Sequence, residues 1–261
     1  EYVDRMSFNL ELPSERSLKL LAPEKTKEGI LTPMNIMSNE FRQAKSLKYG
    51  KFLPAGQTTQ MIVGASPESD GQIVRLTQSL YKKYSLKRVY YSSYIPANDK
   101  NPNLPVKPVG LLREHRLYQA DWLLRFYGFS ASEILDEDEN LAEEYDPKCG
   151  WALKHPEFFP VEINSAPPET LVRVPGIGFK SAYKIVSARR YHSLYFSDLE
   201  KMRVVMKRAK HFITCNGKFF GIDDDIKIKG LLAIESKNEF ATQLSLFSSP
   251  EISASALLGE L

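Results

Sequence analysis

Cysteine is scarce in this sequence, and it has neither a long apolar run nor a strong net charge. The chain of 261 residues contains two cysteines, Cys149 and Cys215, which lie 66 positions apart. This spacing excludes a disulfide framework and matches no zinc or iron–sulfur ligand pattern. No stretch approaches the roughly 18 apolar residues of a membrane helix, so we expect a cytoplasmic protein without a membrane partner. The net charge of +3 requires any nucleic-acid surface to be local.

What is present is the composition of a folded protein. Apolar residues make up 43% of the chain and charged residues 26%, which excludes global disorder. The length allows one large or two modest domains. The chain begins at Glu1 without a methionine and enters a strand almost at once, so we expect a piece of a longer protein.

The first hundred residues alternate strands with helices. Apolar residues at every second position predict a strand over 6–12, and the sequence Pro-Ser-Glu that follows it begins a helix. A short apolar run predicts a second strand over 60–65, before a helix over 70–84, and a third strand is expected over 89–95. This order indicates parallel βαβ units, whose ligands gather at the carboxyl ends of the strands. Three strands cannot close a barrel.

Charge is divided unevenly in the second half. After a connector over 97–110 and a helix over 111–127, residues 133–146 hold eight carboxylates, which we interpret as a solvated helix face. Residues 161–212 hold ten Lys and Arg against four Asp and Glu, a local net charge of +6. The four histidines show no metal-ligand spacing. Basic charge is therefore concentrated in one segment.

Two short helices joined by a glycine turn form the clearest motif. Asn164 or Ser165 is expected to cap the first helix, and a second helix is predicted over 179–189. The amides of the intervening turn lie beside the positive N-terminus of the second helix, where they can grip a phosphate oxygen, and glycine lets a DNA backbone approach closely. The candidate DNA-binding residues are Pro175, Gly176, Ile177, Gly178, Lys180 and Ser181.

This segment resembles the helix-hairpin-helix family, in the form found in competence-type DNA receptors. The matching positions cover about fifty residues when the start of the next helix is counted, and include Ile163, Asn164, Ala166, Glu169, Leu171 and 174–178. The resemblance implies contacts to the phosphate backbone that are independent of base sequence. A plain corner between two helices is the alternative.

Basic residues continue beyond the hairpin in a predicted helix over 198–212. The apolar residues at helical spacing are expected to be buried: Leu199, Met202, Val205, Met206 and Ala209. This leaves five basic side chains in water: Lys201, Arg203, Lys207, Arg208 and Lys210. They either flank bound DNA or form an ordinary solvated face. Lys180 also occupies the place of the Schiff-base lysine in bifunctional DNA glycosylases, with Asp198 near the place of their aspartate, so a glycosylase/lyase is an alternative.

The wider chain, to about residue 230, resembles the C-terminal part of bacterial DNA modification/repair radical SAM proteins. The resemblance rests on the segments SFNLELPSERSLKLLAPEK, GQTTQMIVGASPESD, RVYYSSYIP, LREHRLYQADWLLRFYGF and HPEFFP. It implies the C-terminal half of a TIM-like barrel with a helix-hairpin-helix behind it, and a uracil-DNA-glycosylase-like partner. The S-adenosylmethionine contacts that it implies are Asn9, Glu11, Val63, Gly64, Tyr94 and Ile95.

One departure from that family concerns the cofactor. The Cys-x₃-Cys-x₂-Cys triad that holds its [4Fe–4S] cluster is absent, and neither cysteine of this chain can replace three closely spaced thiolates. In family members the triad lies upstream of the position of Glu1. We therefore expect no cofactor and no radical chemistry in this chain alone. The full-length protein is expected to hold both S-adenosylmethionine and a [4Fe–4S] cluster.

The C-terminal tail carries a short peptide of a different kind. Its sequence resembles the bacterial sliding-clamp-binding pentapeptide Gln-Leu-x-Leu-Phe at Gln243, Leu244, Leu246 and Phe247. A flexible peptide of this type can bury its apolar side chains in a groove of the clamp. Chance, or packing on its own domain, is the alternative.

Together these observations predict an α/β chain with four parts. The expected parts are a partial barrel over 1–97, a connector and helical extension over 98–155, a small all-α helix-hairpin-helix domain over 156–230 and a flexible tail over 231–261. The predicted function is the DNA-binding part of a radical SAM DNA modification/repair protein. The alternative from another class is a non-catalytic DNA-binding module that recruits repair proteins.

Overall fold

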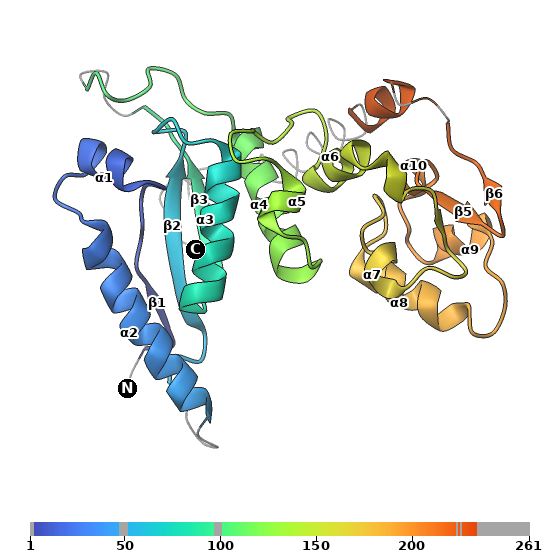
Figure 1. Ribbon diagram of the computed structural model, residues 1–261, viewed down its shortest axis with the longest axis horizontal. Coiled ribbons are helices and arrows are strands. Elements are labelled where there is room, and N and C mark those ends of the chain that lie inside the picture. The colour runs from blue at the N-terminus through green and yellow to red at the C-terminus, as the bar shows by residue number, and fades with distance from the viewer. Residues whose placement is uncertain (1–2, 47–51, 97–100, 223, 225, 234–261) are drawn as a thin grey trace, which may run out of the picture. The chain divides into compact units, whose positions relative to one another are not determined.

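The computed structural model describes residues 3–46, 52–96, 101–222, 224 and 226–233. The chain divides into two compact units, Glu1–Leu141 and Ala142–Leu261, which we describe separately as the first and the second unit. The division falls inside the predicted connector 98–155. Both units mix helices with a small three-stranded sheet, so the α/β class is confirmed (Figure 1). Within the described residues, no helix combines the length and apolar character needed to cross a bilayer.

The first unit is built on a parallel sheet with the order β1-β2-β3. Its strands are β1 (Arg5–Ser7), β2 (Gly56–Val63) and β3 (Arg88–Ser93). Its helices are α1 (Glu15–Leu21), α2 (Lys27–Ser46), α3 (Asp70–Tyr84), α4 (Leu111–Phe126) and α5 (Ala131–Ile134). The helices α2 and α3 contact each other, and α4 packs against β3 (Figure 1). Because all three strands are parallel, their carboxyl ends lie along one edge of the sheet.

Local signals account for α3, whose predicted bounds of 70–84 are confirmed. The Ser69 hydroxyl accepts the backbone N–H of Gln72, and the Gln72 side chain accepts the N–H of Ser69, which completes a capping box. The inward face of α3 carries Ile73 and Leu80, both almost fully buried. An N-terminal cap and an apolar stripe of this kind specify a helix without help from distant residues.

The first two strands differ from the prediction. The sequence predicts one strand over 6–12, but β1 ends at Ser7. Beyond it the Leu10 N–H bonds the Thr59 hydroxyl rather than a strand carbonyl, and Glu11, at a positive φ of 62°, keeps an isolated bridge to Met61. The strand β2 begins at Gly56, before the apolar run at 60–65, because its polar residues find partners inside the protein. The Gln57 amide donates to two helix carbonyls, and the Thr59 hydroxyl donates to the carbonyl of Phe8.

The outer edge of β3 is closed by side chains. The N–H of Val89 donates to the Tyr81 hydroxyl at 3.0 Å, and the N–H of Tyr91 donates to the Tyr118 hydroxyl at 3.0 Å. The N–H of Ser93 donates to a carboxylate on α4 at 2.7 Å. These groups satisfy the backbone donors that a further strand would need, so the sheet ends at β3.

The acidic segment 133–146 is not the predicted solvated helix face. The helix α5 ends at Ile134, since Leu135 is extended and buried, and the chain then crosses the N-terminus of α3 as a loop. The Gly71 N–H donates to the Glu139 carbonyl at 3.0 Å, and a Cβ on Gly71 would lie 2.0 Å from the Asp136 carbonyl oxygen. The Asp70 N–H donates to the Asn140 side chain at 3.0 Å, so the loop satisfies two of the orphan donors at the start of α3.

The second unit is not all-α as predicted. Its helices are α6 (Pro147–Lys154), η1 (Pro156–Phe158), α7 (Pro168–Leu171), α8 (Phe179–Ala188), α9 (Phe196–Lys201) and α10 (Met206–Ala209), and residues 226–233 are also helical. They surround a sheet of β4 (Val161–Glu162), β5 (Ile213–Cys215) and β6 (Lys218–Phe219). The missed signal was Asn216-Gly217, whose positive φ angles of 51° and 72° form the turn of the β5–β6 hairpin. The Glu162 carboxylate accepts both turn amides, and these bonds hold the pKa of Glu162 below its usual value although desolvation acts to raise it.

Two other predictions about this unit were wrong. The helix expected over 198–212 breaks into α9 and α10 at Arg203, which takes a φ of 64°. The Val204 N–H bonds to the Leu199 carbonyl and closes α9, which is a Schellman ending with arginine in the position that usually holds glycine. Neither Asn164 nor Ser165 caps α7, which begins after Pro167.

Candidate nucleic-acid interface

A tight turn connects α7 to α8 and is fixed by backbone contacts. At its centre Gly176 has a φ of 82°, and its carbonyl accepts the Val205 N–H at 3.0 Å. A Cβ on Gly176 would lie 2.5 Å from the Val205 carbonyl oxygen and 3.1 Å from the Ala209 nitrogen. Only glycine meets both demands, so the turn lies directly against α10. Pro175 and Ile177 are buried on either side of it.

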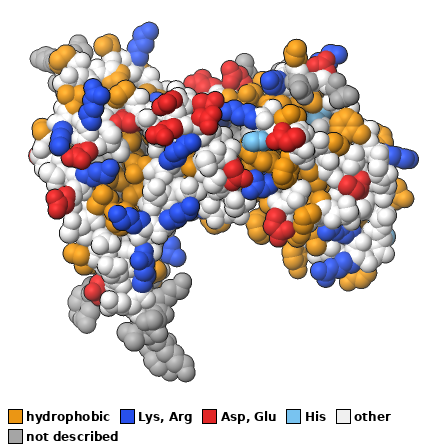
Figure 2. Space-filling model, viewed as in Figure 1, with side chains coloured by type: hydrophobic (Ala, Val, Ile, Leu, Met, Phe, Trp, Pro, Cys, Tyr) orange, Lys and Arg blue, Asp and Glu red, His pale blue; other side chains and the backbone are white. Residues whose placement is uncertain are grey.

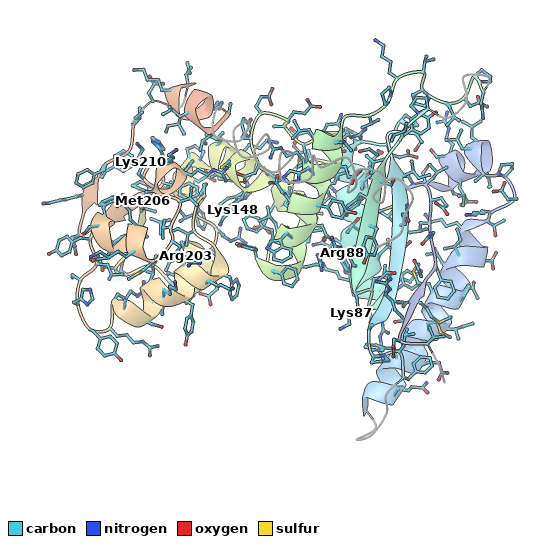
Figure 3. The ribbon with its side chains drawn as sticks, turned by 180° about the vertical axis from the view of Figure 1, so that it is seen from behind. Lys87, Arg88, Lys148, Arg203, Met206 and Lys210 are labelled. Carbon is cyan, nitrogen blue, oxygen red and sulfur yellow. The ribbon has the colours of Figure 1, made fainter. Side chains whose placement is uncertain are left out.

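A half-buried lysine, Lys148, also contacts the turn. The Lys148 ammonium, on α6, donates to the Ile177 carbonyl at 2.6 Å. Enclosure of that ammonium by protein lowers the pKa of Lys148 to about 7, although the carboxylate of Asp146 favours its charged form. Asp146 also caps α6 and accepts Arg208 Nη1 at 3.0 Å, which ties α6 to α10. Figure 3 shows Lys148 with three residues of the α9–α10 region, Arg203, Met206 and Lys210.

The N-terminus of α8 emerges from this turn without a side-chain cap. Its N-cap residue is Gly178, in an extended conformation, so no side chain blocks approach to the first-turn amides. Lys180 lies exposed in that first turn. The Ser181 hydroxyl, in contrast, is buried and donates to the carbonyl of Met202 at 3.1 Å. Of the predicted residues, Gly178 and Lys180 are thus presented at the surface, whereas the Ser181 side chain fastens α8 to α9.

The Lys and Arg side chains of residues 161–212 fall into two groups, those exposed to solvent and those that bond other residues of the protein. Lys180 and Lys184 lie one turn apart on α8, and both are exposed. Arg189 is used internally, since its Nη1 donates to the Ile163 carbonyl at 3.0 Å and to the Ala166 carbonyl at 2.6 Å. In the basic segment 198–212, Arg208 is turned toward Asp146, whereas three cations remain exposed: Lys201, Arg203 and Lys207. Val205 was expected in the core but is 41% exposed.

Aromatic side chains next to these cations were missed by the sequence analysis. Phe179 is 60% exposed and Tyr183 is 74% exposed, while the opposite face of α8 buries Ala182 and Ile185. The signal was available, because Phe179 and Tyr183 are spaced i, i+4 on the face away from the apolar residues. Figure 2 shows apolar and basic side chains interspersed on the visible surface of the second unit. Lys148 had no comparable signal, since its partner lies 29 positions away.

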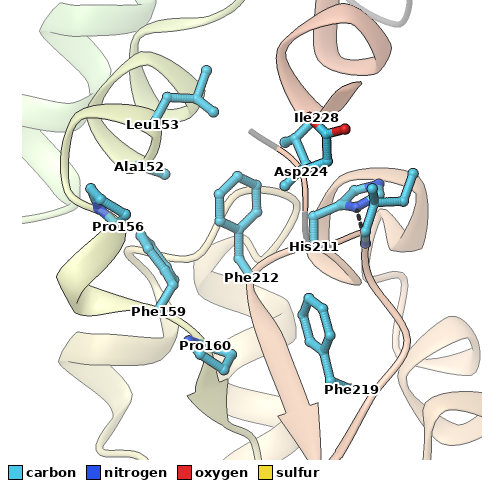
Figure 4. A pocket seen from close by; sticks show the side chains of 11 residues that line it. Ala152, Leu153, Pro156, Phe159, Pro160, His211, Phe212, Phe219, Asp224 and Ile228 are labelled. Atoms are coloured by element: carbon cyan, nitrogen blue, oxygen red, sulfur yellow. Dashed lines mark hydrogen bonds between the residues drawn. The ribbon is translucent and has the colours of Figure 1, made fainter. Parts of the chain in front are cut away.

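A small pocket of about 150 Å³ with a mixed polar and apolar lining also lies in this unit (Figure 4). Its walls are Ala152, Leu153, Pro156, Phe159, Pro160, His211, Phe212, Phe219, Ile222, Asp224 and Ile228. His211 Nδ1 accepts the Ile222 N–H at 3.2 Å, and burial lowers the pKa of His211, so the ring is neutral at pH 7. The Asp224 carboxylate accepts the Ile226 N–H at 3.0 Å. Both polar groups therefore hold the chain beyond β6 in place.

The residues predicted to contact S-adenosylmethionine lie in the first unit: Asn9, Glu11, Val63, Gly64, Tyr94 and Ile95. The structure brings part of this set together at the carboxyl edge of the sheet. The Ile62 N–H donates to the Glu11 carbonyl at 2.7 Å, and the Tyr94 N–H donates to the Val63 carbonyl at 3.0 Å. Asn9 accepts a bond from the Ser7 hydroxyl, and Ile95 is 60% exposed.

This edge does not fit S-adenosylmethionine as it is arranged. A Cβ on Gly64 would lie 2.1 Å from a methyl carbon of Val109, so Val109 fills the space beside the glycine. Tyr94 packs in an apolar cluster with Leu12 and Leu18, and the Glu11 carboxylate accepts Lys25 Nζ at 2.9 Å. The hydroxyl groups of Ser93 and Tyr94 are buried there without a hydrogen-bond partner.

The described residues do not fit an iron–sulfur cluster either. Cys149 and Cys215 are both buried, and burial raises the pKa of each thiol, that of Cys215 to about 11. Within the described ranges, no group of three or more His, Cys, Asp or Glu side chains could hold a metal ion. The clamp-like peptide with Gln243, Leu244, Leu246 and Phe247 lies outside the described residues. No protein-family model, curated protein or solved structure matches the chain.

Proposed function

We propose that the second unit binds DNA through the phosphate backbone, without reading base sequence. The observation that carries this proposal is the turn before α8, which presents an uncapped helix N-terminus beside exposed lysines. Backbone amides and the helix dipole attract an anion there, and Lys180 and Lys184 add positive charge on the same helix. The contacts that fix Gly176 and Ile177 preorganise the turn, so little conformational entropy is lost on binding.

Fluorescence anisotropy with two duplexes of unrelated sequence tests this function. The two affinities should agree within about threefold and should fall steeply with salt, because phosphate binding releases counterions. Replacing both Lys180 and Lys184 with alanine should flatten the slope of log K against log salt by about 2, since each lost phosphate contact removes about 1. Lys218→Ala, an exposed lysine on β6 of the same unit, is the matched control and should leave the slope unchanged. Equal slopes in all three proteins would exclude this surface.

For the first unit, we propose the C-terminal end of a barrel of the radical SAM type. Its three strands are parallel and follow in chain order, and the side chains on the outer edge of β3 suit the last strand of an open barrel. On this proposal the full-length protein would act in DNA modification or repair with S-adenosylmethionine and a [4Fe–4S] cluster, next to a uracil-DNA-glycosylase-like partner. We derive no reaction step from this unit, because its residues do not fit either group.

The surroundings of Lys180 and Asp198 are compatible with one of the two alternative functions and speak against the other. A non-catalytic module that recruits other proteins to DNA needs only the DNA-binding surface and the C-terminal peptide. A glycosylase/lyase needs a desolvated lysine as its nucleophile, whereas Lys180 is exposed to solvent. Asp198 would have to serve that lysine, but its carboxylate accepts the Tyr195 N–H at 3.0 Å and caps α9. Borohydride should therefore trap no covalent complex with abasic-site DNA.

A further inference from the structure

Exposed aromatic rings line the same helix that carries the proposed phosphate contacts. Phe179 and Tyr183 are separated by about 6 Å along α8, given its rise of about 1.5 Å per residue. Tyr191, just beyond the end of α8, is 88% exposed. None of these rings is needed for the core, which α8 reaches through Ala182 and Ile185. Phe179 and Tyr183 are i, i+4 neighbours on one helix face, and adjacent aromatic rings exposed in this way indicate an interaction site.

The side chains around these rings carry positive charge, which indicates a negatively charged partner. Between Glu169 and Asp198 the sequence contains no acidic residue. Lys180, Lys184 and Arg190 are exposed in that stretch, in alternation with the aromatic residues. A polyanion that also offers flat apolar faces satisfies both features. Unpaired nucleic acid has this chemistry, because its bases can stack on aromatic rings while its phosphates meet the cations.

We propose that the exposed rings of Phe179 and Tyr183 on α8, together with Tyr191 just beyond its end, bind single-stranded DNA by base stacking. This inference rests on the proposed DNA-binding function and specifies its substrate as DNA that contains unpaired bases. In a duplex the base faces are already stacked on one another and are closed to a side chain, so the rings add binding energy only where the strands are separated. The phosphate contacts at the turn before α8 serve both forms of DNA, whereas the aromatic face distinguishes between them.

Anisotropy titrations of a 20-nucleotide single strand and of the corresponding duplex, at one salt concentration, test the inference. Tyr183→Ala should weaken binding of the single strand about tenfold, because base stacking contributes about 1–3 kcal/mol per base, and should change duplex binding less than twofold. Tyr183→Phe keeps the ring and should bind both within about twofold of the unsubstituted chain. Tyr191→Ala should act in the same direction as Tyr183→Ala. Trp122→Ala, which removes a ring that is 52% exposed in the first unit, is the control and should have no effect.

The outcomes separate this inference from the function on which it rests. An unchanged single-strand affinity in Tyr183→Ala and Tyr191→Ala, with duplex binding intact, overturns the stacking surface alone. If the unsubstituted chain binds neither the single strand nor the duplex, the proposed DNA-binding function is overturned as well. Because Tyr183 is exposed, its replacement should leave the circular dichroism spectrum unchanged. A loss in Tyr183→Ala that Tyr183→Phe fails to restore would contradict stacking, since the phenyl ring presents the same face.

Discussion

Replacing Gly176 with alanine should destabilise the second unit far more than the same change at Gly217. Both glycines have positive φ, 82° and 72°, so alanine incurs a backbone cost of about 1–2 kcal/mol at either position. At Gly217 nothing lies within 4 Å of the new Cβ, so the backbone cost is the whole loss of free energy of unfolding. At Gly176 the Cβ would lie 2.5 Å from the Val205 carbonyl oxygen, so α10 must retreat from the turn. Losing the 3.0 Å bond from Val205 to Gly176 adds about 1 kcal/mol, before any cost of repacking.

We therefore expect a loss of about 2–3 kcal/mol, plus the cost of repacking α10, in the free energy of unfolding for Gly176→Ala, against about 1–2 kcal/mol for Gly217→Ala. Urea unfolding followed by the fluorescence of Trp151 measures this, because Trp151 is buried in the second unit. A Trp122→Phe background removes the signal of the first unit. Equal losses in the two variants would refute the close approach of the turn to α10.

Three further predictions concern the half-buried ammonium group of Lys148, the C-terminal peptide and the [4Fe–4S] cluster. Because the pKa of Lys148 is lowered to about 7 in the folded chain, the unfolded chain binds the additional proton between pH 7 and about 10.4. The free energy of unfolding should thus rise with pH across that window, by at most about 5 kcal/mol, and Lys148→Met should abolish this rise in urea titrations at pH 6.5 and 9. A peptide of residues 241–249 should bind the bacterial sliding clamp with roughly micromolar affinity, and replacing Leu246 and Phe247 with alanine should abolish binding; absence of binding by the unsubstituted peptide would disprove the clamp motif. Anaerobic reconstitution with iron and sulfide should leave this chain without a stoichiometric [4Fe–4S] cluster, and a cluster detected by its absorbance would contradict the assignment of the cysteine triad to an upstream segment.

Elements with a complete local signal were predictable from the sequence. The helix α3 combines a Ser69–Gln72 capping box with an apolar stripe, and its bounds follow from these alone. The turn before α8 is equally local, since the two glycines and the proline that break the helix are adjacent in sequence. The helix over 198–212 was not predictable in this way, because its break is a Schellman ending formed on Arg203, a residue that rarely takes a positive φ.

Contacts between distant residues account for most of what the sequence could not provide. The polar start of β2 is a strand only because Gln57 finds carbonyls on two helices. The acidic loop bonds the amides of Asp70 and Gly71 on α3, and Lys148 bonds the Ile177 carbonyl in the turn before α8, so both depend on residues far away in the sequence. The Asn216-Gly217 turn is the exception, since this dipeptide indicates a hairpin and was overlooked.

The central claim, that the N-terminus of α8 grips a phosphate, is tested most directly by following backbone amides during a DNA titration. In ¹⁵N–¹H spectra of the isotope-labelled chain, the amides of Gly178 and Lys180 should shift most on addition of duplex DNA, because a bound phosphate accepts hydrogen bonds from the first turn of the helix. The Gly217 amide, which donates to Glu162 at 3.0 Å in the β5–β6 hairpin, should not move. Shifts concentrated elsewhere, with Gly178 and Lys180 unchanged at saturating DNA, would contradict the account.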